Sequence, residues 1–179
     1  MTAGEVFIKV RNYLKDTGKD IFSDWEIYEG INDALRLFAE ESAKAGDDKG
    51  YFSNTESLVL TNKKVALPTD FVRIKRAFDS SGKELLHIFD HEPNLGEVRI
   101  LGNTLSSGES SLTLNYYCYP PTVSMYNDAI DLPSSMLLPF SKAAACCVSN
   151  TDQAAIMVAQ YFNGEKIQVS QPTTGGDNQ

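Results

Sequence analysis

Residues 65–74, which read Val-Ala-Leu-Pro-Thr-Asp-Phe-Val-Arg-Ile, decide the fold class of this chain. Val65 and Leu67 lie two positions apart in the first half of the stretch, and Val72 and Ile74 repeat that spacing in the second half. A period of two is typical of half-buried antiparallel strands. The proline, threonine and aspartate between the halves supply a fixed φ angle and side-chain hydrogen-bonding groups, as a turn requires. The stretch therefore predicts two strands joined by a turn.

The same period continues on both sides of this stretch, from Tyr51 to about Pro121. Further apolar residues that alternate in this way are Leu58 and Leu60, Val98 and Ile100, and Leu112, Leu114 and Tyr116. Segments with turn-forming residues separate them at 79–82, 101–103 and 106–109. We predict five or six strands in a small antiparallel β-sandwich or curled sheet over residues 51–122.

Before the strands, the pattern is helical. Thr2 and Glu5 have the spacing of a capping box, and the apolar residues after them follow a helical period up to Gly18, which we predict as the stop. Ser23 and Glu26 form a second such box, and the helix that follows runs to a stop at Gly46. A tight turn is expected between the two helices. Because the pair cannot bury both apolar stripes alone, another layer must cover it.

The segment after the strands returns to helical spacing. A linker runs from Pro120 to Pro133, and one helix follows it, with Pro139 in its first turn. Asn150 or Thr151 is expected to cap a final helix. The apolar residues of that helix are Ala154, Ile156, Val158, Ala159 and Phe162. These late helices are the natural cover for the first two.

The predicted fold is therefore α+β, a helical bundle made of N-terminal and C-terminal helices with an inserted small antiparallel β-sandwich or sheet. Its segments are an N-terminal helix pair (1–50), an antiparallel β layer (51–122), C-terminal helices that complete the bundle (123–166) and a flexible tail (167–179). The tail contains little apolar material, so we expect it to be extended or disordered until it is bound.

Charge and composition exclude several classes of partner. The formal net charge is −8, and none of the segments 1–50, 51–122 and 123–179 is net positive. Nucleic-acid binding normally needs clustered positive charge, so we expect no tight DNA binding. No signal-peptide pattern opens the sequence, and no apolar run approaches the roughly 18 residues that span a bilayer, so we expect no membrane partner. Cys118, Cys146 and Cys147 lack disulfide or zinc spacing and are expected to be reduced.

Both histidines of the chain lie in one segment, residues 87–92. His87 and His91, with Asp90 and neighbouring acids, could hold a metal if the segment were helical. In an extended strand they stand about 13 Å apart, too far for one ion. No nucleophile elbow and no phosphate-binding glycine loop is present elsewhere. We therefore predict a protein that is not an enzyme and uses neither a metal nor a cofactor.

Two groups of residues are candidate contact sites. Arg73 and Lys75 lie on one face of a predicted strand, where they could meet an acidic neighbour or DNA, or form a plain solvated face. Tyr116, Tyr117 and Tyr119 form an aromatic strand edge that ends in two prolines. Tyrosine is enriched in interfaces because it buries a large area at small entropic cost, yet it is equally at home at a domain edge.

Three stretches in a fixed order resemble the head-to-tail adaptor, or connector, family of tailed bacteriophages. They are residues 25–35, the Leu-Pro-x-Asp-Phe motif within 65–74, and residues 112–117 followed by Pro120-Pro121, Asp131-Leu132-Pro133 and the closing helix. Taken together, they extend the likeness over about residues 5–165.

This resemblance implies a structural virion protein at the head–tail interface, assembled in the bacterial cytoplasm. It implies a ring, typically dodecameric, in which the chain contacts copies of itself, the portal protein and the next tail or nozzle component. DNA passes through the channel without tight binding, and an acidic wall would repel its phosphates. The family brings no catalytic residues. In some relatives the C-terminal segment reaches into the portal, which makes Gln168, Gln171 and Pro172 candidate contacts.

Three alternatives remain open from the sequence. The first is a tail-completion or baseplate subunit. The second is a virion-associated metal-dependent or wall-degrading hydrolase centred on His87, Asp90 and His91. The third is a carbohydrate-binding β domain, which would need tyrosines exposed on a strand face.

Overall fold

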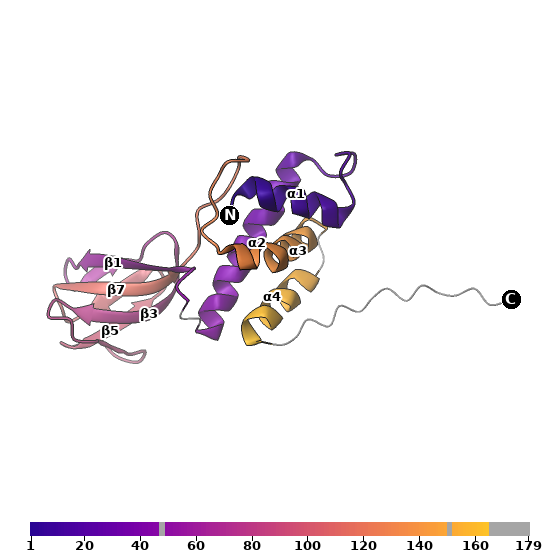
Figure 1. Cartoon of the computed structure of the whole chain (residues 1–179). Helices are drawn as coiled ribbons and strands as arrows, with labels where there is room; N and C mark the ends of the chain where they lie inside the picture. Colours follow the sequence, from indigo (N-terminus) through magenta and orange to yellow (C-terminus); the bar gives the residue numbers. More distant parts are fainter. Residues whose placement is uncertain (47–48, 150–151, 165–179) are drawn as a thin grey trace.

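The computed structural model describes residues 1–46, 49–149 and 152–164, which form a helical body and a β-body (Figure 1). The helices are α1 (Ala3–Leu14), α2 (Asp24–Ala45), α3 (Leu137–Val148) and α4 (Gln153–Asn163), with a 3₁₀ turn, η1 (Ser134–Met136), before α3. The strands are β1 (Ser53–Val59), β2 (Lys64–Ala66), β3 (Phe71–Asp79), β4 (Leu86–His87), β5 (Glu97–Leu101), β6 (Thr104–Ser107) and β7 (Ser111–Cys118). Helices from both ends of the sequence pack together, and all strands lie between them in the chain, which confirms the predicted α+β class.

The start of α1 is fixed by its own cap and by a distant loop. The predicted capping box is present, because the Thr2 hydroxyl accepts from the Glu5 N–H and the Glu5 carboxylate accepts from the Thr2 N–H. The next N–H groups, of Ala3 and Gly4, donate to carbonyls of the linker between β7 and η1, at 2.8 Å each. The ring of Tyr126 in that linker lies so close to Gly4 that a Cβ atom there would stand 2.4 Å from it. A side chain at this position would have to displace the Tyr126 ring, which is itself half exposed.

The end of α1 differs from the prediction. The helix stops at Leu14, and Lys15 adopts the left-handed conformation with φ 56°, so Gly18 is not the stop. The connection to α2 is also a longer loop rather than a tight turn. This loop is built around Asp16, which is buried and forms a 2.6 Å ion pair with Arg11. The Asp16 carboxylate also accepts N–H groups from residues 20–22, which shapes the loop around it.

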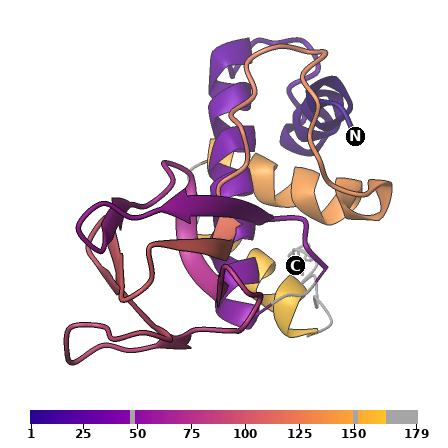
Figure 2. The same cartoon turned by 90° about the vertical axis from the view of Figure 1, so that its left-hand side faces the viewer.

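Helix α2 is the centre of the helical body. Its predicted Ser23–Glu26 capping box and its Gly46 stop are both present. Helices α1, α3 and α4 pack against it, so the late helices cover the first two as predicted (Figure 2). The largest fully buried side chains of this core are Val6, Val10, Ile27, Ile31, Phe38, Phe52, Met136 and Phe140.

Helix α4 is only partly buried. Ala154 and Val158 face the core, whereas Ile156, which the sequence groups with them, is 57% exposed. The expected cap at Asn150 or Thr151, and the tail from residue 167 onward, lie outside the described residues. Within the described residues, Cys118, Cys146 and Cys147 form no disulfide.

The β-body consists of two sheets around one core. The strand order is β1-β7-β3 in the first sheet and β2-β6-β5-β4 in the second. Apolar residues of both sheets share the core, with Val98, Leu105, Leu114 and Tyr116 among the most buried. Seven strands are present instead of five or six, and β4 pairs with β5 in parallel, so the second sheet is mixed rather than antiparallel. Strands β3 and β7 contact α2, which joins the two bodies.

Candidate interaction surfaces

The predicted aromatic strand edge is not an edge. Strand β7, which carries Tyr116 and Tyr117, runs between β1 and β3 at the centre of its sheet. Tyr116 is 1% exposed, and its hydroxyl donates to Asp70 at 3.1 Å and accepts from Asn54 at 3.3 Å. Burial, and next the hydrogen bond to Asp70, raise the pKa of Tyr116 to about 12. In the subunit this side chain is therefore a core residue.

Tyr117 and Tyr119 are also engaged within the subunit. Tyr117 is buried on the outer face of the sheet, where the Lys75 ammonium lies 4.8 Å from its ring centroid. The hydroxyl of Tyr119, just beyond β7, donates to the Glu40 carboxylate of α2 at 2.9 Å. Burial, followed by this hydrogen bond, raises the pKa of Tyr119. Tyr119 therefore ties the β-body to the helical body.

Arg73 forms a second tie between the two bodies. Its guanidinium donates to the backbone oxygen of Ala43, in the last turn of α2, at 3.1 Å. A positive charge at this end of a helix also interacts favourably with the helix dipole. Lys75 belongs to a bulge, because the register of β3 on β7 shifts between Ile74 and Arg76. Arg73 thus contacts Ala43 of α2 and Lys75 contacts the Tyr117 ring, so the two side chains do not form the predicted shared face.

The two histidines face different neighbours. The His87 ring lies 4.5 Å from the Phe89 ring, and burial lowers the pKa of His87. The two ring nitrogens of His91 lie 2.9 Å from an Asp90 oxygen and 3.2 Å from a Glu97 oxygen. Both hydrogen bonds raise the pKa of His91, and the bond to Asp90 has the larger effect. Among the residues that the structure describes, no three His, Cys, Asp or Glu side chains gather as a metal site would require.

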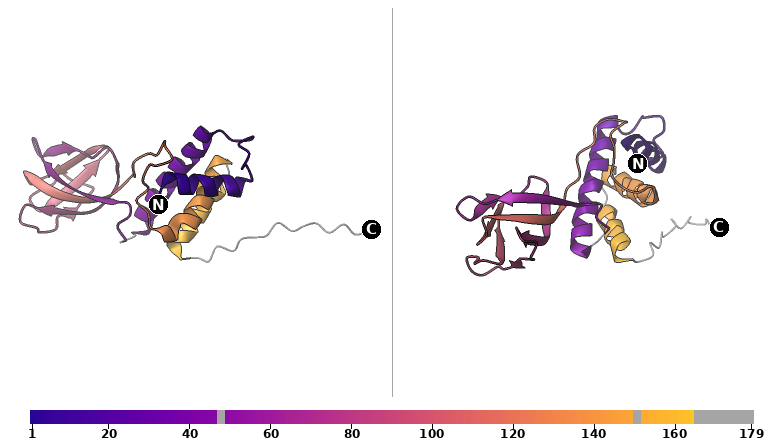
Figure 3. Two further views of the ribbon diagram at one scale, coloured as in Figure 1. Left: turned by 45° about the horizontal axis from the view of Figure 1, so that its top comes forward. Right: turned by 60° about the vertical axis from the view of Figure 1, so that its left-hand side comes forward.

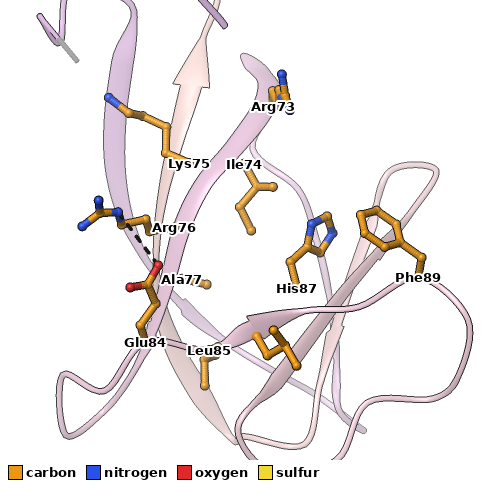
Figure 4. Close-up of a pocket in the computed structure, with 10 residues that line it drawn as sticks. Arg73, Ile74, Lys75, Arg76, Ala77, Glu84, Leu85, His87 and Phe89 are labelled. Carbon is orange, nitrogen blue, oxygen red and sulfur yellow. Dashed lines mark ion pairs between the residues drawn. The ribbon is translucent and has the colours of Figure 1, made fainter. Parts of the chain in front are cut away.

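A groove lies between β3 and β4, where the sequence predicts no site (Figure 4). It has a volume of about 670 Å³ and is lined by Ile74, Ala77, Leu85 and His87, with basic side chains of β3 along one side. Leu86 and Phe89 form its rim and are 64% and 78% exposed. The signal for it in the sequence is weak, since Phe89 is a single aromatic residue in a polar segment.

The helical body exposes large apolar side chains of its own. Ile21, in the loop after α1, and Trp25, in the first turn of α2, are 68% and 69% exposed. Trp25 belongs to the stretch 25–35 that carries the family resemblance. Large exposed apolar side chains on a folded domain are typical of contact surfaces when they cluster. The remaining candidate contacts, Gln168, Gln171 and Pro172, lie outside the described residues.

Comparison with known proteins gives the family. A model of the family described as SU10 adaptor protein matches residues 1–175. The comparison with curated proteins gives no match. No helix in the described part of the chain is both long and apolar enough to cross a membrane. The family match covers the helical body, which both ends of the chain build, and the β-body inserted between them. The chain therefore belongs to the SU10 adaptor protein family, a family of structural adaptors at the head-to-tail junction of bacteriophages.

Proposed function

We propose that the chain is the subunit of a ring, typically dodecameric, which docks beneath the portal and presents a surface to the next tail component. The observation that carries this proposal is the family match over residues 1–175. Assembly in the host cytoplasm before incorporation into the virion is part of the same proposal. The protein acts through contact surfaces and not through a reaction centre.

The distribution of exposed apolar side chains supports ring formation. A closed ring of identical subunits needs two different, complementary patches on each subunit. The chain offers Ile21 and Trp25 on the helical body, and Leu86 and Phe89 on the β-body. A stable contact of this kind buries about 800 Å² on each partner. Both bodies thus expose large apolar side chains that such patches could use.

The charge of the protein supports a channel that does not hold DNA. The net charge is −8, so the ring as a whole repels phosphate groups. Of the arginines of β3, Arg73 donates to Ala43 within the subunit, and Arg76 lies in an exposed 3.9 Å ion pair with Glu84. A duplex that is not held by salt-dependent phosphate contacts can slide through the ring.

Sedimentation velocity tests the proposal. The full-length chain is run alone and then with purified portal protein. We expect the chain to sediment with portal as a ring of many copies. A chain that stays monomeric when portal is present at a concentration of about 10 μM, where typical specific protein contacts form, contradicts the ring.

A further inference from the structure

The β-body has an incomplete seam between β3 and β4. Strand β3 is the outer strand of the first sheet, and β4 is the outer strand of the second. The two begin as a hairpin, with a bridge between Phe78 and Glu84 and a 2.8 Å hydrogen bond from the Leu85 N–H to the Ala77 oxygen. Within the described residues no strand pairing continues beyond this point. The two segments diverge instead (Figure 4), and the groove opens between them.

The backbone accounts for the divergence. The register of β3 on β7 shifts between Ile74 and Arg76, and a bulge of this kind bends the strand and increases its local twist. On the other side, the N–H groups of Leu86 and Ile88 donate to β5 at 2.9 Å each. Successive residues of a strand direct their backbone groups to opposite sides, so the backbone of His87 faces away from β5, toward β3. The groove is thus bordered by a strand edge that is available for pairing.

The side chains of the groove suit an extended peptide. Its floor is apolar, with Ile74 from β3 and Leu85 from the hairpin, and Phe89 lies at the rim. The His87 ring also lines the groove.

We propose that a strand from the C-terminal segment of a neighbouring copy, residues 166–170, inserts into this groove and closes the seam. Ile167 and Val169 alternate with Gln168 and Ser170, which is the period of a half-buried strand. Pro172 follows and ends the pairing, since proline has no N–H for the ladder. Addition of a strand to an exposed edge obtains affinity from the backbone and specificity from alternate side chains. Ile167 and Val169 then face the apolar floor.

The position of α4 favours a neighbouring copy over the same copy. In the right-hand view of Figure 3, α2 stands between the β-body and α4. Gly164 ends α4, and only Glu165 precedes the proposed strand. Two extended residues span about 7 Å, too little to pass around a helix about 10 Å wide. Each copy therefore gives its strand to the next, a head-to-tail arrangement that rests on the proposed ring.

A photo-crosslinking experiment tests the strand. A full-length variant with a benzophenone amino acid in place of Phe89 is irradiated with a synthetic peptide of residues 164–173. The matched control carries the same group in place of Leu101, which is exposed at the end of β5, outside the groove. We expect attachment of the peptide at position 89 to exceed that at position 101 by about tenfold. Equal attachment at the two positions overturns the proposal.

Two peptide variants test the orientation. Ile167→Asn with Val169→Asn places uncharged polar groups toward the apolar floor and should lower attachment by about tenfold. Gln168→Asn with Ser170→Asn makes a matched change on the opposite face and should change attachment by less than about threefold. If both pairs have the same effect, the strand does not insert as proposed.

Crosslinking in assembled particles distinguishes the strand proposal from the ring proposal. In rings formed with portal, the group at position 89 should attach to residues 165–179 of another copy. Attachment to portal or to a tail protein overturns the strand proposal and leaves the ring standing. Conversely, peptide attachment by a chain that stays monomeric with portal shows that the groove accepts the strand, but it overturns both the ring and the exchange of strands between copies.

Discussion

The side-chain amide of Asn32 pairs with the backbone of Val123 across 91 positions of sequence. The Asn32 Nδ2 donates to the Val123 oxygen at 2.9 Å, and the Val123 N–H donates to the Asn32 Oδ1 at 2.8 Å. Both residues are buried. The pair fastens the linker that follows the β-body to the middle of α2. One side chain thus fixes the path by which the chain returns to the helical body.

Removal of this amide should destabilise the protein. Asn32→Ala leaves two buried backbone groups of Val123 without partners, at a cost of about 2–4 kcal/mol in the free energy of unfolding. Chemical denaturation measures the loss. Asp33→Ala is the control, because the neighbouring side chain is exposed and the change should stay within about 0.5 kcal/mol. Equal losses for the two variants would show that the pair is not the cause.

At Gly30, α2 lies close against α3. A Cβ atom there would stand 2.2 Å from a Val148 methyl group and 3.1 Å from the Ala144 oxygen. Gly30→Ala should destabilise the protein by about 1–3 kcal/mol through overpacking. The sign of the stability change distinguishes overpacking from helix propensity, because Gly→Ala in an uncrowded helix stabilises the helix by about 1 kcal/mol. Adding Val148→Ala should recover part of the loss, and thermal unfolding of the three variants measures it.

Asp16 should make stability depend on pH in the acid range. Its burial raises the pKa, but N–H groups of the 20–22 loop and the Arg11 guanidinium outweigh burial and lower the pKa of Asp16. The ionised carboxylate therefore stabilises the fold above the ordinary value of about 3.9, and this contribution is lost as pH falls through the folded pKa.

The test is the Asp16→Asn variant, compared with the natural chain by thermal unfolding between about pH 7 and pH 3. The variant should be less stable near neutral pH, and the difference should shrink below about pH 4. A difference that is constant over the whole range would mean that the charge of Asp16 is not what stabilises the loop.

Arg73 should stabilise the contact between the β-body and the helical body, whereas Arg76 should not. Arg73→Ala removes a hydrogen bond between a charged group and Ala43, at a cost of about 1.5–3 kcal/mol, and should speed hydrogen exchange in the last turn of α2. Arg76→Ala, on the same strand, removes an exposed ion pair and should cost less than about 1 kcal/mol. If the exchange rates in α2 respond equally to both variants, Arg73 is not the tie.

The features that the sequence predicts well are local ones. The Thr2–Glu5 and Ser23–Glu26 boxes and the Gly46 stop depend on groups within three or four positions, so their spacing alone reveals them. The apolar alternation also gives the location of most strands, because one face of each is buried.

The errors arise from side-chain interactions and strand positions that the spacing of residues in the sequence does not show. Lys15 adopts the helix-ending conformation because the Arg11–Asp16 pair shapes the loop, and no property of Lys15 or Gly18 indicates this. Tyr116 and Tyr117 are misplaced because alternation gives the faces of a strand but not its position in the sheet. The groove beside Phe89 depends on two strands diverging at a bulge, which a pattern of single residues does not encode.

Image reconstruction of purified portal mixed with the full-length chain tests the central claim most directly. We expect a ring of added density on one end of the portal, coaxial with it, with a channel through its centre and the two bodies of each subunit resolved. Portal without added density at concentrations above about 10 μM, or density attached away from the axis, would contradict the account.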